Sequence, residues 1–109
     1  MRPLLRSEEM ILLAVWKLQP DAYGVTIRRY LSQTTGHDWS IASVYVPLDR
    51  MTDNGLLKAT DQAPTGKRGG RRKRTFALTE KGMATLRQMR TVHDTLWAGF
   101  PSLTSNPAT

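Results

Sequence analysis

The sequence predicts a mainly helical fold with a small β-hairpin, arranged as a winged helix-turn-helix and followed by one further helix. Three observations support this prediction. Residues 7–54 carry three helical patterns, two short strand-like segments then flank a basic run at 67–74, and a last helical repeat reaches residue 100. We expect residues 1–79 to form the winged domain, 80–100 the last helix and 101–109 a polar, disordered tail.

The first predicted helix begins at Ser7, whose hydroxyl is a helix cap, with Glu8 and Glu9 beside the positive end of the helix dipole. Residues 10–18 read MILLAVWKL and are apolar on almost every side. We therefore expect this helix to be central in the fold and covered on most sides.

The second predicted helix follows a break at residues 19–20, with Asp21 as its cap and Gly36 at its end. Its apolar and aromatic positions follow the helical period: they are Tyr23, Ile27, Tyr30, Leu31 and Thr34. A short turn at 37–39 leads to the next helix. Two helices joined by a tight, glycine-containing turn indicate a helix-turn-helix.

The third predicted helix has two faces that need different partners. Ser40 is its cap, and Asn54 and Gly55 are a suitable stop because both tolerate the left-handed conformation. The side expected to pack on the core consists of Ile41, Val44, Tyr45, Leu48 and Met51. The side expected to face a ligand consists of Ala42, Ser43, Val46, Arg50 and Asn54.

Pro47 lies two turns inside this helix, where it cannot donate a hydrogen bond to the carbonyl of Ser43. Such a proline costs roughly 3 kcal/mol in a helix interior. We expect a single helix that is kinked here. The alternative is two shorter pieces that meet at Pro47.

A hairpin with a charged tip is predicted after Gly55. Residues 56–60 and 75–78 have strand character, and Phe76 and Leu78 share one face. Between the strands, residues 67–74 read KRGGRRKR, which supplies six of the net +7 charges and leaves about +1 for the rest of the chain. A local basic run indicates either a polyanion partner or a solvated loop. Its position beside a two-faced helix favours nucleic-acid binding.

The last predicted helix is capped by Thr79 and Glu80 and ends at Gly99 and Pro101. It carries an apolar seam: the seam and its neighbours are Leu86, Met89, Val92, His93, Leu96, Trp97 and Phe100. The seam either packs on the first helix or pairs with a second copy of the chain. Because its end extends beyond the reach of a small core, we favour a homodimer.

Composition argues against several classes of protein. There is no cysteine, and His37 and His93 are the only histidines, so we expect no metal site and no cofactor. Thr65, Gly66 and Lys67 lack the remaining positions of a phosphate-binding loop, and we expect no enzyme. The longest apolar run is too short to span a membrane, and the first residues lack a signal-peptide core. We expect a cytoplasmic protein with no membrane partner.

The chain resembles the PadR family of bacterial transcriptional regulators over residues 4–90. The matching motifs are Tyr23-Gly24, Ser43-Val44-Tyr45 with Leu48, Asn54-Gly55-Leu56-Leu57, Gly69-Gly70 with Arg74, and Leu78-Thr79-Glu80-Lys81-Gly82. Proline often follows the tyrosine directly in the family, whereas Val46 intervenes here. The chain resembles the compact subgroup with a single C-terminal helix. The resemblance implies a winged-helix DNA-binding domain, a dimer built through the helix after the wing, repression of nearby genes and, in many members, a small-molecule effector.

We predict that the third helix enters the major groove of double-stranded DNA while the hairpin follows the backbone. Ser43 is expected to read base edges or phosphate, and Arg50 to reach the backbone. By resemblance, Tyr45 is expected to contact a phosphate. The predicted DNA-binding residues are Ser40, Ala42, Ser43, Tyr45, Val46, Arg50, Lys67, Arg68, Gly69, Gly70, Arg71, Arg72 and Lys73. Trp16, Trp39 and Trp97 are candidates to line an effector cavity, although packing is their commoner role.

Two other functions compete with this one. The basic run at 67–74 would serve as an arginine-rich arm in an RNA-binding module, which would tolerate changes at Ser43 and Tyr45. The seam at 86–100 would bind a different protein in an interaction adaptor.

Overall fold

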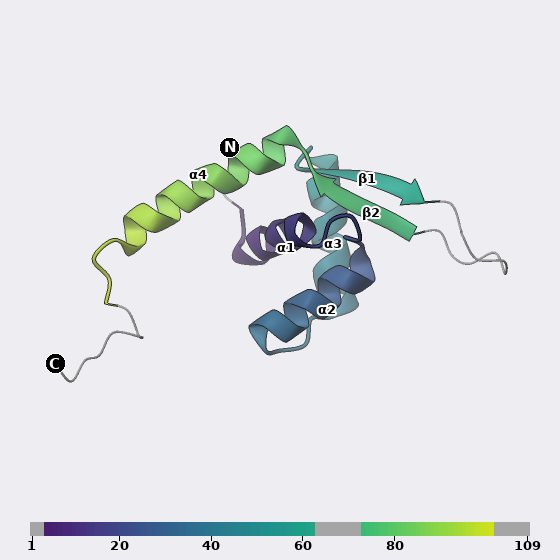
Figure 1. The fold of residues 1–109 in the computed structure, drawn as a ribbon, viewed down its shortest axis with the longest axis horizontal. Coiled ribbons are helices and arrows are strands. Elements are labelled where there is room, and N and C mark those ends of the chain that lie inside the picture. The colour runs from purple at the N-terminus through teal and green to yellow at the C-terminus, as the bar shows by residue number, and fades with distance from the viewer. Residues whose placement is uncertain (1–3, 63–72, 102–109) are drawn as a thin grey trace.

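The computed structural model describes residues 4–62 and 73–101, and in them it confirms a mainly helical fold with a two-stranded antiparallel hairpin (Figure 1). The elements, in chain order, are α1 (Arg6–Lys17), α2 (Gly24–Thr35), α3 (Ile41–Asp53), β1 (Leu57–Gln62), β2 (Lys73–Leu78) and α4 (Glu80–Trp97).

The core lies between α1, α2, α3 and the base of the hairpin. Its fully buried large side chains are Ile11, Leu12 and Val15 of α1, Ile27 of α2, and Val44, Leu48 and Met51 of α3. Phe76 of β2 closes the core from the hairpin side. The first helix is central, since it contacts α2, α3, α4 and β2. It is not covered on every side, however, because Leu13 and Trp16 are 40% and 56% exposed.

Two helix starts differ from the prediction. Helix α1 is preceded by Leu5, whose N–H donates to Oε1 of Glu8 at 2.8 Å, so the capping group is the Glu8 carboxylate and not Ser7. Helix α2 begins at Gly24, later than a cap at Asp21 would require. The reason is a long-range contact, because the carbonyl of Ala22 accepts from the N–H of Phe76 at 2.8 Å. This contact holds the chain extended up to the start of α2.

Helix α3 is a single helix that continues through Pro47, which confirms one helix in place of two shorter pieces. The kink expected at Pro47 stays a prediction. The hydroxyl of Ser40 accepts from the N–H of Ser43 at 3.1 Å, which confirms the cap, and Gly55 takes the left-handed conformation with φ of 81°. Pro47 is buried with the other core-facing residues of the helix. Ile41 and Tyr45 were expected to be buried and are 62% and 39% exposed. The first turn of α3 extends beyond the core, and the Tyr45 ring lies at the edge of the domain against Gly24.

The hairpin is longer than predicted, since its two strands cover 57–62 and 73–78 in place of 56–60 and 75–78. Leu57 pairs with Leu78, Ala59 with Phe76, and Gln62 with Lys73. Its tip, which holds most of the basic run, lies outside the described residues.

Helix α4 begins as predicted, with the hydroxyl of Thr79 accepting from the N–H of Gly82 at 3.0 Å. Its first turns pack closely on the domain, since a Cβ at Gly82 would lie 2.3 Å from the carbonyl oxygen of Leu56. Leu86 packs against the core, and every residue from 91 to 100 is exposed. The second half of α4 therefore extends away from the domain (Figure 1). The predicted tail lies almost entirely outside the described residues.

Candidate nucleic-acid interface

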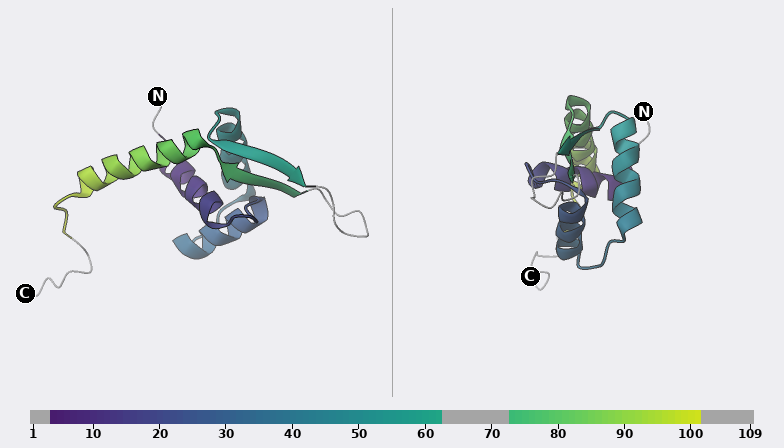
Figure 2. Two further views of the ribbon diagram at one scale, coloured as in Figure 1. Left: turned by 45° about the horizontal axis from the view of Figure 1, so that its top comes forward. Right: turned by 90° about the vertical axis from the view of Figure 1, so that its right-hand side faces the viewer.

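Helix α3 presents an exposed face opposite its buried one. Figure 2 (right) shows α3 at the right-hand edge of the domain, with the other elements to its left. Ser40, Ala42, Ser43 and Val46 are exposed on it, and Val46 has 55% of its surface accessible. Because Val44, Pro47, Leu48 and Met51 lock the other face into the core, the rotation of the helix about its axis is fixed. The small exposed side chains leave room for another surface to approach.

Tyr45 lies against the start of α2. A Cβ built on Gly24 would be 2.0 Å from the Tyr45 hydroxyl oxygen, so only glycine leaves space for this ring. The tyrosine remains 39% exposed. Its hydroxyl is therefore held near the first turn of a helix, where free backbone N–H groups and the helix dipole favour an anion.

The hairpin brings a cation to the same place. Lys73 Nζ lies 4.6 Å from the centre of the Tyr23 ring, and Thr75 forms a β-bridge with Tyr23. Side chains from α3 and β2 thus meet at Tyr23 and Gly24. Neither residue follows from the pattern of α3 or of the basic run, although the Tyr-Gly pair is one of the motifs that carry the family resemblance.

Arg74 joins the hairpin to α3. Its Nη1 lies 3.6 Å from a carboxylate oxygen of Asp49, its Nε lies 4.0 Å from Asp61, and its guanidinium stacks 5.7 Å from the Phe76 ring centre. All three charged side chains are at least half exposed, so each pair stabilises the fold by at most about 1 kcal/mol. The contacts orient the hairpin more than they stabilise it.

A second set of bonds fixes the base of the hairpin. The Nε2 amide of Gln19 donates to the carbonyl of Phe76 at 2.7 Å and to that of Val15 at 2.9 Å. The side chain thus ties β2 to the end of α1. The two described strands therefore have a defined direction relative to α3.

Arg50 is bound to a buried carboxylate. Its Nε and Nη2 both lie 3.1 Å from Oε2 of Glu8, whose side chain is fully buried, while the arginine side chain is 41% exposed. This pair joins α1 to α3 across 42 residues of sequence. The predicted backbone-contacting arginine is thus also a link between two helices, which the sequence pattern of either helix alone does not show.

Of the predicted hairpin contacts, Lys73 is the one that the structure describes. The others, Lys67, Arg68, Gly69, Gly70, Arg71 and Arg72, lie outside the described residues. Their proposed contacts rest on their sequence and on the direction of the two strands.

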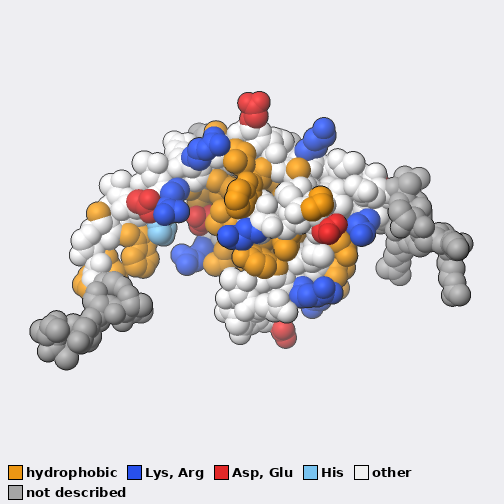
Figure 3. Space-filling model, viewed as in Figure 1, with side chains coloured by type: hydrophobic (Ala, Val, Ile, Leu, Met, Phe, Trp, Pro, Cys, Tyr) orange, Lys and Arg blue, Asp and Glu red, His pale blue; other side chains and the backbone are white. Residues whose placement is uncertain are grey.

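The far half of α4 exposes large apolar side chains. Val92, Leu96, Trp97 and Phe100 are 52%, 77%, 54% and 63% exposed. Figure 3 shows hydrophobic side chains at the far end of α4 and over the middle of the same face of the molecule. Such an apolar surface on a small domain indicates an interaction site.

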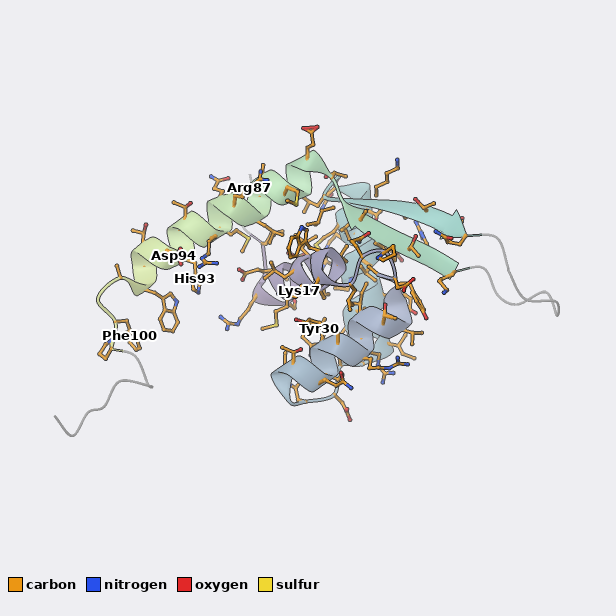
Figure 4. All side chains as sticks on the ribbon, viewed as in Figure 1. Lys17, Tyr30, Arg87, His93, Asp94 and Phe100 are labelled. Atoms are coloured by element: carbon orange, nitrogen blue, oxygen red, sulfur yellow. The ribbon has the colours of Figure 1, made fainter. Side chains whose placement is uncertain are left out.

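Aromatic contacts order this end of α4. The His93 ring stacks on Trp97 with centres 5.6 Å apart, and Trp97 meets Phe100 edge to face at 5.1 Å. Figure 4 shows His93 on the lower side of α4, which faces the rest of the domain, with Phe100 just beyond the end of the helix. A hydrogen bond from Arg90, with a weaker one from His93, holds the pKa of Asp94 below its usual value.

The fold and the geometry of α3 beside an anchored hairpin define a winged-helix protein of the nucleic-acid-binding type. Residues 12–88 match the transcriptional regulator PadR-like family. This match spans well over half of the chain, and the chain belongs to that family. It is therefore a DNA-binding transcriptional regulator, in a family of regulators and not of enzymes.

Several solved structures share the fold. A PadR-like transcription factor from Bacteroides fragilis is 21% identical, with a TM-score of 0.70 over 82% of this chain and 81% of that one. A PadR-like regulator from Bacillus cereus is 23% identical, with a TM-score of 0.67 over 84% of both chains. RosR of H. salinarum is 21% identical, with a TM-score of 0.69 over 92% of this chain and 83% of that one.

No curated protein sequence matches the chain. In the ranges 4–62 and 73–101, no helix combines the length and hydrophobicity needed to cross a membrane.

Proposed function

We propose that the protein is a sequence-specific regulator that binds double-stranded DNA as a homodimer and represses transcription by occupying its operator in the cytoplasm. The observation that carries the proposal is the exposed face of α3, fixed by a buried opposite face and flanked by an anchored basic hairpin. An α-helix fits the major groove of B-DNA, where each base pair presents a distinct pattern of donors and acceptors.

Sequence is read by the first two turns of α3. The hydroxyls of Ser40 and Ser43 suit base edges or phosphates, and the methyl groups of Ala42 and Val46 suit the thymine methyl. Small side chains let the helix backbone lie deep in the groove. Substitution of Ser43 is expected to change which sequences are preferred, and not merely to weaken binding.

The backbone is held on the hairpin side of the groove. The Tyr45 hydroxyl, the first-turn N–H groups of α2 and the Lys73 ammonium form one phosphate site around Gly24. Residues 67–72 extend this contact along the backbone or into a minor groove. Arg50 holds α3 at its angle through Glu8, and a contact from Arg50 to the backbone uses the guanidinium nitrogen that Glu8 does not bind.

A second copy of the chain covers the exposed half of α4. The proposed interface consists of Leu86, Met89, Val92, His93, Leu96, Trp97 and Phe100. Leu13 and Trp16 of α1 are also exposed and apolar, and we add them to this surface. Two-fold pairing would present two α3 helices to a palindromic operator, as in other helix-turn-helix dimers.

Selection of duplexes from a random pool tests sequence-specific binding. An enriched, conserved sequence is expected, and Ser43→Ala should shift it while Lys73→Gln weakens binding to all duplexes alike. With six to ten phosphates engaged by the dimer, affinity should fall roughly 10³- to 10⁵-fold from 50 to 200 mM salt. A flat salt response, or equal affinity for every duplex, contradicts the proposal.

Sedimentation velocity tests the dimer. The wild type is expected to be dimeric at micromolar concentration and Leu96→Asp monomeric. Gln88→Asp places the same charge at an exposed position on α4 and should remain dimeric. A monomeric wild type refutes the homodimer and leaves the apolar surface for a different protein.

Fusion of the enriched sequence to a reporter promoter tests repression. Expression is expected to fall when the protein is produced and to recover with Ser43→Ala. Increased expression would make the protein an activator.

A further inference from the structure

A cleft of about 480 Å³ lies at the N-terminal end of α3, open to solvent on one side. Of its lining residues, only Ser40 and Ser43 belong to the contacts proposed above. Its walls include Arg6 and Met10 of α1, His37, Asp38 and Trp39 of the turn before α3, and Ser43 of α3 itself. Ser43 is therefore shared between the cleft and the exposed reading face.

The wall formed by the turn is held in place. The N–H of Trp39 donates to the Ser32 hydroxyl at 3.1 Å, and its indole Nε1 donates to Thr35 Oγ1 at 3.0 Å. The His37 ring stacks on the Trp39 ring, with the ring centres 5.9 Å apart and an angle of 15° between the ring planes. The imidazole therefore rests on a fixed indole that is only 6% exposed, and Arg6 lines the same cleft. A ligand entering the cleft meets hydrogen-bond donors from two separate elements.

The position of the cleft relative to the hairpin indicates what kind of ligand it would bind. The hairpin joins α3 near its other end, through the ion pair of Arg74 with Asp49. The major groove of B-DNA is about 12 Å wide, so a helix in it has a phosphate backbone at each wall.

We propose that this cleft binds a backbone phosphate of duplex DNA at the groove wall opposite the hairpin. The inference rests on the proposed DNA-binding function and adds a second, separate grip on the backbone. Arg6 supplies the charge, and the His37 ring and the Ser40 and Ser43 hydroxyls supply hydrogen-bond partners. With the hairpin at one end of α3 and the cleft at the other, the depth and tilt of the helix in the groove are both determined.

Asp38 gives the proposal a sharp test, because its carboxylate lies in the same cleft and repels a phosphate. Removing the positive charge should therefore weaken binding, and removing the negative charge should strengthen it. The variants are Arg6→Gln and Asp38→Asn. Their matched controls are Arg87→Gln and Glu80→Gln, which make the same charge changes at exposed positions of α4.

The measurement is the affinity of each full-length variant for the enriched duplex at several salt concentrations. Arg6→Gln is expected to weaken binding roughly tenfold per protomer and to reduce the salt slope by about one per protomer. Asp38→Asn is expected to tighten binding, and both controls should stay within about threefold of the wild type. Urea unfolding of each variant reports on the fold independently.

The proposal is overturned if Arg6→Gln matches Arg87→Gln in affinity and slope, or if Asp38→Asn does not bind more tightly than Glu80→Gln. In either case Ser43→Ala and Lys73→Gln would still alter binding, so the proposed function would stand. If the wild type selects no duplex at all, the proposed function itself fails first.

Discussion

Replacement of Gly24 by alanine should separate DNA binding from folding. The new Cβ would lie 2.0 Å from the Tyr45 hydroxyl oxygen and 2.1 Å from its Cζ, so the ring must leave its place. Because the tyrosine is already 39% exposed, it can turn into solvent without disturbing the core. Alanine is also about 1 kcal/mol more favourable than glycine within a helix. The free energy of unfolding should therefore change by no more than about 1 kcal/mol.

The effect on DNA affinity should be much larger. A hydrogen bond to a charged group contributes about 1.5–3 kcal/mol, so loss of the contact from the Tyr45 hydroxyl to a phosphate should weaken binding roughly 10- to 150-fold. Tyr45→Phe removes the same hydroxyl and leaves the ring beside Gly24. If both variants act on one contact, the double variant should bind scarcely more weakly than Gly24→Ala alone.

Fluorescence anisotropy of a labelled, enriched duplex measures these affinities, and urea unfolding of the same preparations measures stability. The reasoning is refuted if Gly24→Ala folds normally and binds like the wild type. It is also refuted if the losses from Gly24→Ala and Tyr45→Phe add fully in the double variant, since they would then act on separate contacts.

Three further predictions concern stability and charge. Gly82→Ala should lower the free energy of unfolding, measured by urea melts, by about 1–3 kcal/mol. The new Cβ meets the rigid backbone carbonyl of Leu56, whereas at Gly24 it meets a ring that can move. Unchanged stability would contradict this close packing. Glu8→Gln should also lower the free energy of unfolding by about 1–3 kcal/mol, since its buried hydrogen bonds to Arg50 lose their charge. Arg50→Lys should be destabilised as well, because lysine does not reproduce the hydrogen bonds of the arginine. The pKa of the Asp94 carboxyl, measured by NMR, should lie below its ordinary value of 3.8 and should rise towards that value in Arg90→Gln. Because folding lowers this pKa, the small stabilising effect of the ionised carboxylate is present above pH 3.8. It disappears as the pH falls through the pKa of the folded state.

Features set by local chemistry could be predicted from the sequence. Ser40 and Thr79 are caps whose hydroxyls need only a backbone N–H three residues later. Gly36 and Gly55 take the left-handed conformation at helix ends, which glycine adopts without strain. The core side of α3 also followed from its helical period for Val44, Leu48 and Met51. Ile41 and Tyr45 are exposed instead, because periodicity alone does not show where the core stops.

Features set by distant residues could not be predicted in this way. The start of α2 depends on Ala22 bonding to Phe76, far along the chain. The partner of Arg50 is Glu8, which had the pattern of a first-turn helix carboxylate and is buried instead. The place of Tyr45 depends on a glycine in another helix. Two of these three contacts hold α3 against α1 and α2, so the binding surface is fixed by residues outside its own segment.

The central claim is that the exposed side of α3 and the neighbouring hairpin together hold duplex DNA. Backbone amide NMR spectra recorded while the enriched duplex is added test it most directly. The account predicts the largest signal changes at residues 40–46, at Tyr23 and Gly24 and at Lys73, with little change at the far half of α4. Changes confined to α4, or spectra unaltered by the duplex, would contradict it.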